Sequence, residues 1–490
     1  MIELFDHQKS GIEFLKKKGK AILADEMGLG KTRQAIVASG EAGPFQHGAL
    51  RTVGTLIVCP ASLKINWMRE IRMVYPNDSI EILSSTEEPE NRSAAWYIIN
   101  YDILEKRLPF ILEQVAAGKL DTLILDEAHY IKGKSLRAAC VVGGAFKPKG
   151  GERIKFDGIA KKMRQVYCLT GTPLLNRPIE LFNLLRAIGH PYGNARGVFA
   201  KRFCGAFQRQ IWNKYLGRHI FITDESGASN IEELSAGIRD AFLRRKKKDV
   251  LDLPEKIVSI ADCELSPEWK KRYGAAWEDY LGFLEANPIP ERNIDNILMA
   301  RHLVEIQKLK QVCSRSKIKR LADDVENAAE QDEKVIIFSQ YTETIRQLSE
   351  ELAERKIVNV TLTGADDMNE RQKAVDQFQK EGSPVKAFIA NIKAGGVGLN
   401  LTAATIVMFV DMDWSPEIHN QAEDRAHRIG QGEMVNVYYY ICGGTIEDDI
   451  VEILKLKRET IDAILEGRKV GTAEGAQAAF LRRMAERAKS

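Results

Sequence analysis

Short apolar runs alternate with amphipathic segments along residues 1–186. The strand-sized apolar runs, each ended by polar residues or by glycine and proline, lie at 20–24, 55–59, 96–99, 122–125 and 166–169. Stretches with helical spacing lie between them, as at 63–74 and 179–188. Runs that are apolar at every position are typical of strands buried on both faces of a parallel sheet, and their alternation with helices indicates βαβ units. The pattern therefore predicts an α/β lobe over 1–186.

The same alternation returns over 334–466. Its apolar runs lie at 335–338, 360–362, 386–389, 406–410 and 435–440, and its helical segments at 342–354, 369–379, 415–428 and 446–465. The segment between the two α/β regions is helix-rich, with few strand-like runs. We therefore predict an α/β fold with two tandem parallel-sheet lobes and helical insertions between them.

The predicted boundaries follow from these changes in pattern. They are 1–186 for lobe 1, 187–250 for its helical insertion, 251–333 for the linker and the helical insertion of lobe 2, 334–466 for lobe 2, and 467–490 for a basic C-terminal tail. The tail ends in a basic helix-like segment, which we interpret as a frayed helix rather than a contact surface.

Composition limits the class of protein but does not choose its function. The chain has 490 residues, 44% of them apolar, and its 71 Lys and Arg against 68 Asp and Glu give a net charge of +3. These values exclude wholesale disorder and a histone-like basic protein, but not a nucleic-acid binder, because net charge averages over patches. The seven cysteines form no C-x-x-C pair, which suggests neither a zinc site nor a disulfide framework. With no signal-peptide pattern and no apolar run long enough to span a membrane, we expect a protein of a reducing cytosol without a membrane partner.

A glycine-rich loop over residues 24–32, Ala-Asp-Glu-Met-Gly-Leu-Gly-Lys-Thr, follows a predicted strand and opens a helix. Gly28 and Gly30 allow backbone N–H groups to approach phosphate oxygens, and the helix N-terminus adds positive potential. Lys31 would reach the β- and γ-phosphates and Thr32 would hold Mg²⁺. Asp25 stands where the strict phosphate-loop pattern has its first glycine, so a simple glycine turn remains the alternative.

Two further segments carry charges suited to phosphate chemistry. Asp126 and Glu127 end a buried strand, where the first can bind Mg²⁺ and the second can polarise an attacking water. Arg425 and Arg428 are three residues apart, so on a helix they share one face and could act as arginine fingers. The alternatives are a solvated acidic loop and a solvated charged helix face.

Taken together, these motifs resemble one family. The resemblance rests on Gln8, the DEMGLGKT loop, Pro60-Ala-Ser-Leu, the DEAH box at 126–129, Leu169-Thr-Gly-Thr-Pro, Phe242-Leu-Arg-Arg-Lys-Lys-Lys-Asp-Val with Leu253-Pro-Glu-Lys, Gly395-Gly-Val-Gly-Leu-Asn, and Gln421-Ala-Glu-Asp-Arg-Ala-His-Arg-Ile-Gly-Gln, in this order. The ordered set resembles the SWI/SNF-type ATPases of helicase superfamily two, which are double-stranded DNA translocases. It covers about residues 5–465 and is similar to the compact HARP-like, annealing-helicase branch.

The resemblance implies two RecA-like lobes, with ATP and Mg²⁺ as cofactors and double-stranded DNA as partner. With DNA as partner, we expect a cytoplasmic, nucleoid-associated location in a prokaryote or viral host, or a nuclear one in a eukaryote. It implies that Asp25 is the family's own variant of the loop, that Gln8 reads adenine, and that Thr170 and Thr172 couple phosphate state to lobe closure. The implied nucleotide contacts are Gln8, Asp25, Glu26, Met27, Gly28, Leu29, Gly30, Lys31, Thr32, Gly398, Arg425 and Arg428. The implied catalytic residues are Lys31, Asp126, Glu127, Arg425 and Arg428, and the implied metal ligands are Thr32 and Asp126. The implied DNA contacts are Ser62, Asn66, Asn100, Tyr101, Ser339, Gln340, Thr363, Gly364, Asn391, Lys393 and Trp414. For Trp414 the residues alone favour a core tryptophan.

Basic clusters add an electrostatic argument for DNA. Segments 147–164, 239–248 and 308–320 carry net charges of +5, +5 and +6, so the rest of the chain is mildly acidic. We expect them to contact DNA phosphates without reading sequence. The sequence thus predicts a monomeric, ATP-dependent translocase on duplex DNA that does not separate strands processively. A strand-separating or annealing DNA or RNA helicase and an ATP-gated DNA-binding scaffold remain the alternatives.

Overall fold

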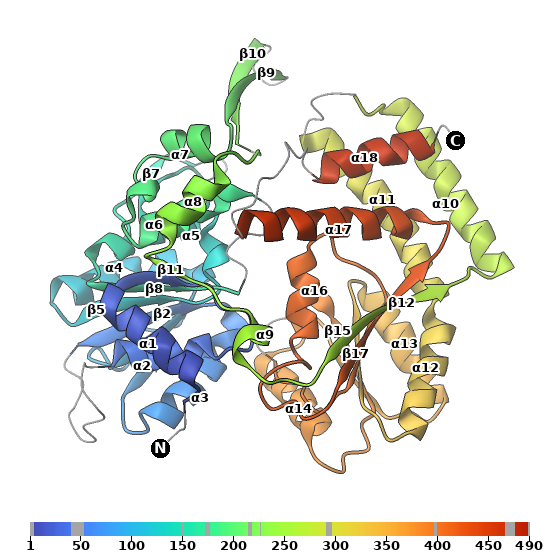
Figure 1. Ribbon diagram of the computed structural model, residues 1–490, viewed down its shortest axis with the longest axis horizontal. Helices are drawn as coiled ribbons and strands as arrows, with labels where there is room; N and C mark the ends of the chain where they lie inside the picture. The colour runs from blue at the N-terminus through green and yellow to red at the C-terminus, as the bar shows by residue number, and fades with distance from the viewer. Residues whose placement is uncertain are drawn as a thin grey trace. The chain divides into compact units, whose positions relative to one another are not determined.

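The computed structural model describes residues 4–40, 53–148, 151–171, 177–213, 218–225, 227–290, 296–395, 399–465 and 476–488. Two compact units make up the chain (Figure 1). Unit 1 comprises Met1–Leu251 with Ile461–Thr472, and unit 2 comprises Asp252–Thr460 with Ala473–Ser490. Within the described ranges, none of the helices has the length and apolar character that crossing a membrane requires.

Unit 1 is built on a seven-stranded parallel sheet in the order β11-β1-β8-β5-β2-β4-β3. Its strands are β1 (Lys20–Leu23), β2 (Gly54–Cys59), β3 (Ile80–Ile82), β4 (Trp96–Asn100), β5 (Leu120–Leu125), β8 (Gln165–Leu169) and β11 (Phe242–Leu243). Every residue of β2 and β4 is buried, as continuous apolar runs require when helices cover both faces. The predicted parallel sheet of lobe 1 is confirmed.

The helices of unit 1 connect these strands. They are α1 (Asp6–Lys18), α2 (Lys31–Ser39), α3 (Lys64–Val74), α4 (Leu104–Ala116), α5 (Leu136–Val142), α6 (Leu181–Ala187), α7 (Arg196–Phe203), α8 (Ile231–Ile238) and α9 (Lys247–Val250). Two antiparallel hairpins lie outside the main sheet, β6 (Gly144–Phe146) with β7 (Ile154–Phe156), and β9 (Phe207–Asn213) with β10 (Arg218–Asp224).

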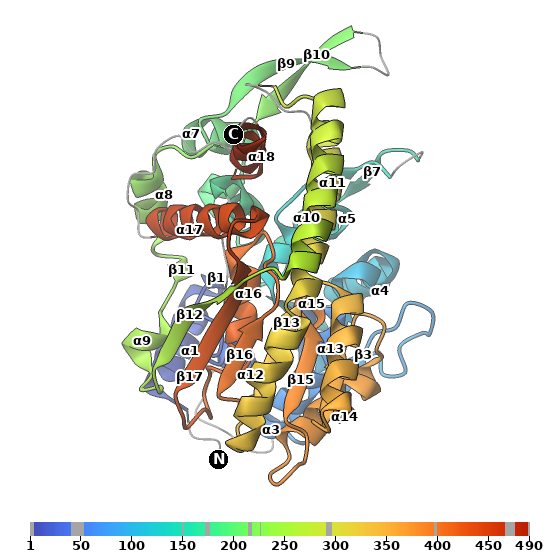
Figure 2. The ribbon, with the colours of Figure 1, turned by 90° about the vertical axis from the view of Figure 1, so that its right-hand side faces the viewer.

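The β9–β10 hairpin corrects the prediction of a helical insertion over 187–250. Figures 1 and 2 show that it extends away from the sheet of unit 1. Phe207 and Phe221 on it are 58% and 68% exposed. A two-stranded ribbon that buries little of its surface lacks the continuous apolar run by which buried strands are found, and this explains why the pattern missed it.

Unit 2 carries a six-stranded parallel sheet in the order β12-β17-β16-β13-β15-β14. The strands are β12 (Lys256–Cys263), β13 (Val335–Ser339), β14 (Asn359–Leu362), β15 (Ala387–Asn391), β16 (Ile406–Phe409) and β17 (Val435–Cys442). The helices are α10 (Pro267–Ala286), α11 (Asn296–Ser316), α12 (Ile318–Glu330), α13 (Thr342–Glu354), α14 (Met368–Gln379), α15 (Ile392–Gly395), α16 (Pro416–Glu423), α17 (Ile446–Leu465, whose last residues belong to unit 1) and α18 (Ala476–Arg487). The second predicted parallel sheet, and with it the fold class, is confirmed.

Strand β12 corrects the prediction that 251–333 holds only a linker and helices. It pairs along its whole length with β17, from Lys256 opposite Val435 to Cys263 opposite Cys442. As an edge strand it alternates between partly buried and exposed residues, so its sequence has no fully apolar run to reveal it.

The C-terminal segment is a third correction, because a frayed basic tail was expected there. Phe480, Leu481 and Met484 of α18 are fully buried in the core of unit 2, and α18 packs against α11 (Figure 2). The Arg487 guanidinium donates to the Thr445 carbonyl and to Asp449. The basic residues of this helix mask an apolar stripe at positions 480, 481 and 484, which is a helical spacing.

Candidate active site

Three chain segments meet at the carboxyl ends of adjacent strands in unit 1. The phosphate loop follows β1, Thr170 follows β8, and Asp126 follows β5; β8 lies between the other two strands. The Thr170 N–H donates to the Leu23 carbonyl at 3.1 Å. A Cβ on Gly171 would lie 2.5 Å from Cγ of Met27 in the loop. The sheet order thus brings together three motifs that the sequence separates; Thr172 lies outside the described residues.

The phosphate loop has the backbone that its sequence predicts. Gly28 and Gly30 have φ angles of 83° and 71°, and the second directly precedes α2. A Cβ on Gly30 would lie 2.2 Å from Nε2 of Gln8, so the side chain of Gln8 lies against the loop. The Lys31 ammonium donates to the carbonyls of Asp25 (2.7 Å) and Glu26 (3.0 Å). Positive φ angles at the two glycines turn the chain tightly into the N-terminus of α2, which suits an anionic ligand.

Asp25 does not point its side chain at the loop's concave side. Its carboxylate is fully buried and accepts hydrogen bonds from Arg245, at 2.9 Å from Nε, and from Gln34. Met27 lies within the loop, and Thr32, the last residue of the motif, is the second residue of α2. The departure from the strict loop pattern therefore has a structural partner, Arg245, which the sequence did not identify.

The Asp126 carboxylate is buried and oriented from two sides. Nε1 of Trp67 donates to its Oδ2 at 2.7 Å, and the N–H of Glu127 donates to its Oδ1 at 2.9 Å. Burial, together with the charge of Glu127, raises the pKa of Asp126 to about 6, although these two hydrogen bonds act in the opposite direction. Glu127 has a left-handed backbone with φ of 48°, and its Oε2 lies 3.3 Å from Nδ1 of His129. The two carboxylates therefore point in different directions from one turn.

Arg425 and Arg428 converge, but not on a helix as predicted. Helix α16 ends at Glu423, and the following residues form turns in which N–H groups bond three residues back, as Arg425 does to Ala422. Even so, Nη1 of each arginine donates to the Leu399 carbonyl at 3.2 Å. Gly398, predicted to face the nucleotide, lies outside the described residues.

Gln431, at the end of the same motif, is a structural residue that the sequence did not single out. Its buried side-chain amide donates to the carbonyls of Thr402, Ala404 and Ala426 at 3.0–3.3 Å. These contacts fix the turn that carries the two arginines, because a buried amide left without partners is costly.

In unit 1, the residues predicted to contact DNA differ in exposure. Ser62 is partly exposed and Asn66 is exposed, at the start of α3. Asn100 and Tyr101 are buried at the end of β4. The Tyr101 hydroxyl donates to the Asp126 carbonyl at 2.8 Å. As a correction, Tyr101 does not present its side chain at the surface and instead supports the end of β5.

In unit 2, a buried carboxylate organises the predicted DNA segments. Oδ2 of Asp411 accepts the Ser339 hydroxyl at 2.6 Å, and its Oδ1 accepts the backbone N–H and the side-chain amide of Gln340 at 2.9 and 3.0 Å. The Asn391 amide donates to the Gln340 carbonyl at 3.0 Å. Ser339 is buried, so its side chain is a second correction to the set of surface contacts. Asp411 itself was missed, although it lies three residues before the predicted contact Trp414.

The remaining predicted contacts lie nearer the surface. Gly364 and Lys393 are exposed, and the Lys393 ammonium lies 3.4 Å from Asp413. The Thr363 hydroxyl donates to Asp366 at 3.1 Å. Lys393 is therefore the exposed cation among the predicted contacts in the described part of unit 2.

Trp414 is half-buried and serves as a packing partner of α18. Its ring meets that of Phe480 edge-on at 4.8 Å, and the Lys310 ammonium lies 5.0 Å from its centre. The Lys457 ammonium donates to the Trp414 carbonyl. These contacts favour the core interpretation, which the residues alone had indicated, over a duplex contact.

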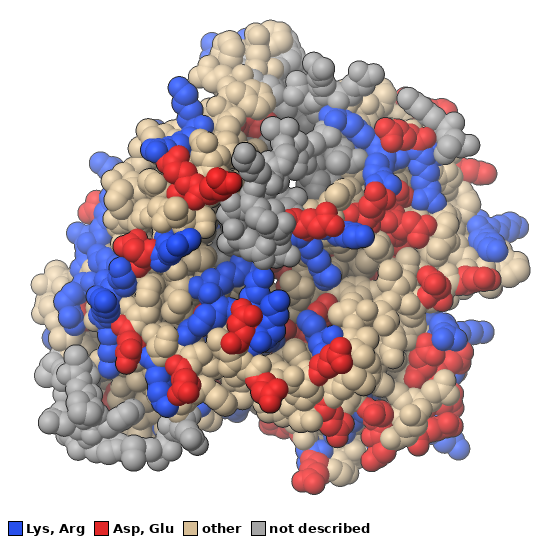
Figure 3. Space-filling view, viewed as in Figure 1, with Lys and Arg blue, Asp and Glu red and all other residues tan. Residues whose placement is uncertain are grey.

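The basic clusters are only partly a surface feature. Figure 3 shows lysine and arginine side chains interspersed with acidic ones on the visible face. Lys310 and Lys317 are buried; the first donates to the Met412 carbonyl and the second to Glu447. Arg245 is engaged with Asp25. The three basic clusters therefore offer fewer cations to DNA phosphates than the sequence count suggests.

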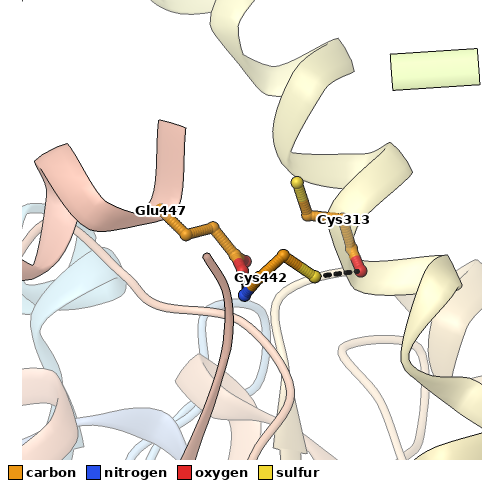
Figure 4. Close-up of side chains that lie close together, drawn as sticks. All are labelled: Cys313, Cys442 and Glu447. Atoms are coloured by element: carbon orange, nitrogen blue, oxygen red, sulfur yellow. Dashed lines mark hydrogen bonds between the residues drawn. The ribbon is translucent and has the colours of Figure 1, made fainter. Parts of the chain in front are cut away.

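Cys313, Cys442 and Glu447 form a close buried group, with one ligand atom from each within 4.8 Å of the others (Figure 4). The Lys317 ammonium lies 2.7 Å from the Glu447 carboxylate and donates to the carbonyls of Val410 and Tyr440. A cation already neutralises this carboxylate, so we interpret the group as an internal ion pair beside two thiols rather than a metal site.

Comparison with known proteins decides the family. The SNF2-related domain matches residues 7–318, and the helicase conserved C-terminal domain matches residues 316–430. The chain belongs to the SNF2-related family. This confirms the family that the ordered motifs indicated.

Individual relatives agree with this membership. The chain is 30% identical to the mouse "DNA annealing helicase and endonuclease ZRANB3" over 95% of this chain and 41% of that protein. It is 29% identical to an "uncharacterized ATP-dependent helicase" of Mycoplasma pneumoniae, over 94% of this chain and 42% of the other. It is 30% identical to a Caenorhabditis elegans "SWI/SNF-related matrix-associated actin-dependent regulator of chromatin subfamily A-like protein 1 homolog", over 94% and 62%. The chain thus spans about 40% to 60% of the length of these relatives.

Among solved structures, the "Sulfolobus solfataricus SWI2/SNF2 ATPase core in complex with dsDNA" matches with 24% identity and a TM-score of 0.39. The match covers 95% of this chain and 94% of that one.

Proposed function

We propose that this SNF2-related protein hydrolyses ATP and uses the energy to move along double-stranded DNA. The observation that carries the proposal is the meeting of the phosphate loop, Thr170 and the Asp126–Glu127 pair at adjacent strand ends of unit 1. A glycine loop that opens a helix holds phosphates, and a carboxylate pair beside it handles metal and water, which is the set of groups that phosphoryl transfer needs.

The residues in unit 1 fit ATP and Mg²⁺. Gly28 and Gly30 have positive φ angles and no side chains, so their backbone N–H groups can approach phosphates, and the Lys31 ammonium donates to two carbonyls of the same loop. Thr32 and Asp126 offer hydroxyl and carboxylate oxygens, the ligands Mg²⁺ prefers. Bound there, the metal would neutralise charge on the phosphates.

The roles of the charged residues follow from the same chemistry. Glu127 would take the proton of the attacking water, since Asp126 is tied by Trp67 and by the backbone. Arg425 and Arg428 would stabilise charge on the γ-phosphate. The convergence of both guanidinium groups on the Leu399 carbonyl supports a shared task.

DNA as the partner is supported by the printed name of the mouse relative and by the predicted DNA segments at the strand ends of both sheets, and we propose that the DNA is a duplex. The test is an ATPase assay with saturating double-stranded DNA, single-stranded DNA or RNA. We expect the largest stimulation by the duplex. Equal rates with and without duplex DNA would refute the proposal, and stronger stimulation by single strands or RNA would favour a strand-separating helicase.

A catalytic variant separates an enzyme from an ATP-gated DNA-binding scaffold. We expect Glu127→Gln to lower DNA-stimulated phosphate release by at least about 100-fold, because the general base is lost. Glu105→Gln, at an exposed residue of α4, is the matched control and should retain the wild-type rate. Unchanged phosphate release in the Glu127 variant would end the catalytic assignment.

Strand annealing is a second candidate, favoured by the printed name of the mouse relative. Triplex displacement reports movement along a duplex, whereas annealing of complementary strands does not require it. Both assays on one preparation distinguish the two: we expect ATP-dependent triplex displacement, and annealing without displacement would replace translocation by the second candidate.

A further inference from the structure

The chain that leaves unit 1 is bonded to the phosphate loop just before it crosses into unit 2. The N–H groups of Ala24 and Glu26 donate to the carbonyls of Leu243 and Arg245 at 2.7 and 3.0 Å. In return, the N–H of Lys247 donates to the Glu26 carboxylate at 2.8 Å. The start of the loop is therefore paired, residue by residue, with the segment that follows β11.

A buried ion pair reinforces this backbone pairing. Two nitrogens of the Arg245 guanidinium donate to the two oxygens of Asp25, whose side chain is 0% exposed against 13% for the arginine. Gln34 of α2 donates to Asp25 at 3.3 Å and to the Leu29 carbonyl at 3.0 Å, and it accepts from Arg245 at 2.9 Å. One network thus joins both ends of the phosphate loop to Arg245.

The network is packed without spare room. A Cβ on Gly11 of α1 would lie 1.9 Å from Oε1 of Gln34 and 2.7 Å from Nη2 of Arg245. Helix α1 therefore closes directly over the ion pair, which limits how far the guanidinium can move. A bidentate Arg–carboxylate pair in such a setting fixes orientation as well as position.

The same chain enters unit 2 through a second ion pair, in which Lys256 is partly exposed and Glu423 is buried. The Lys256 ammonium, at the first residue of β12, lies 2.7 Å from Oε2 of Glu423, and the Tyr439 hydroxyl donates to Oε1 at 2.6 Å. The ring Nε2 of His427 bonds the Pro254 carbonyl at 2.8 Å. Glu423 is the last residue of α16, immediately before the turn that carries Arg425.

The charges of this second pair are mutually stabilised. Burial alone lowers the pKa of Lys256, but the carboxylates of Glu423 and Asp424 outweigh it and the net pKa is raised. Burial likewise raises the pKa of Glu423, but Lys256, the Tyr439 hydroxyl and the charge of Arg458 together outweigh it, so the net pKa is lowered. Both groups are therefore charged at neutral pH.

We propose that Arg245 and Lys256 are positioning residues at the two ends of the linker. Arg245 holds the phosphate loop of unit 1 through Asp25, and Lys256 holds the arginine-bearing turn of unit 2 through Glu423. Ten residues separate them in the sequence. The inference rests on the proposed function, because it assigns both residues to the same ATP hydrolysis without contact with the nucleotide.

The two ends should fail in different ways. Arg245→Gln leaves the Asp25 carboxylate buried without its cation and loosens the loop, so we expect ATP to bind about tenfold more weakly or worse. Lys256→Gln loosens the turn with Arg425 and Arg428, which act on the transition state, so we expect kcat to fall about tenfold with ATP affinity retained.

Matched control variants distinguish a loss of active-site positioning from a general loss of folding stability. Arg196→Gln breaks a bidentate pair with Glu225 in unit 1, and Arg355→Gln breaks contacts with Glu351 and two further acids in unit 2. Their side chains are 23% and 21% exposed, close to the 26% of Lys256. We expect these controls to lower the unfolding midpoint while leaving ATP affinity and kcat per folded molecule unchanged.

The experiment measures, for each full-length variant, the ATP dissociation constant without DNA, kcat at saturating duplex DNA, and the urea midpoint. Arg245→Lys keeps the positive charge but loses the bidentate guanidinium, so we expect it to recover part of the ATP affinity that Arg245→Gln loses. If Arg245→Gln does not fold, the comparison is made with Arg245→Lys. The inference is overturned if Arg245 variants bind ATP as Arg196→Gln does, or if Lys256→Gln turns over as Arg355→Gln does. Wild-type protein without DNA-stimulated turnover would refute the proposed function, and the ATP-binding comparison would still support or overturn the role of Arg245.

Discussion

His419 should make unit 2 less stable as the pH falls below about 6.5. The imidazole, on α16, is 1% exposed and lies edge-on against the rings of Phe409 and Tyr439. Its Nε2 accepts the backbone N–H of Asp413 at 2.9 Å, so this nitrogen carries no proton in the folded protein. Burial, with the Arg458 charge adding to it and the Glu423 charge opposing it, lowers the pKa of His419 to about 4 from an ordinary value near 6.5.

The size and direction of the effect follow from proton binding. Between pH 4 and pH 6.5 the unfolded chain binds the proton that the folded protein excludes, so the free energy of unfolding rises with pH. At about 1.4 kcal/mol for each pH unit of the gap, His419 contributes about 3 kcal/mol. This contribution is complete above pH 6.5 and is lost as the pH falls towards 4.

The assay is urea unfolding of the wild-type chain and His419→Gln at stepped pH, followed by circular dichroism. Glutamine can still accept the Asp413 N–H but cannot take up a proton, so the variant lacks this pH-dependent part. We expect the wild type to lose about 3 kcal/mol more than the variant between pH 7 and pH 4. Parallel stability curves for the two proteins would refute a neutral, buried His419.

Three further substitutions test other contacts by urea unfolding. Trp67→Phe removes the hydrogen-bond donor to the buried Asp126 and should lower the free energy of unfolding by about 2 kcal/mol. It should also raise the Mg²⁺ concentration needed for half-maximal ATPase activity, and an unchanged Mg²⁺ requirement would contradict this role. Phe480→Ala should lower the free energy of unfolding by about 3–5 kcal/mol, because Phe480 of α18 lies in the core of unit 2. An unchanged free energy of unfolding would restore the frayed-tail interpretation. Glu447→Gln leaves the Lys317 ammonium buried without its carboxylate and should lower the free energy of unfolding by about 3–5 kcal/mol. A loss well below this range would mean that the ion pair is not needed for stability.

Much of the fold could be predicted because its signals are local. The apolar runs at 55–59 and 335–338 correspond to β2 and β13, which are interior strands of the two parallel sheets. Strand β12 and the β9–β10 hairpin were missed because strands at an edge or outside a sheet bury only some of their residues. Helix α18 was missed because its charges dominate the composition around three apolar positions.

The site was predicted as far as its motifs are contiguous. The phosphate loop and the Asp126–Glu127 turn are each a few residues long, so type and spacing identify them. Arg245 lies 220 residues from Asp25, and Lys256 lies 167 residues from Glu423. Pairs so distant depend on strand order and linker path, which hydrophobic pattern does not determine.

The motif residues fall into two groups that only burial separates. Lys31, Lys393 and Asn66 are at least partly exposed and can meet a ligand. Tyr101 and Gln431 are buried, and their polar groups donate hydrogen bonds to backbone carbonyls. These hydrogen bonds hold the turns of their motifs in place. A buried polar side chain with satisfied hydrogen bonds specifies local geometry, since moving it would leave its partners unpaired. A residue's place in a motif therefore does not by itself assign it to ATP or DNA. The same holds for charge, because Arg245 of the basic cluster 239–248 is paired with Asp25 at the start of the phosphate loop and not with DNA.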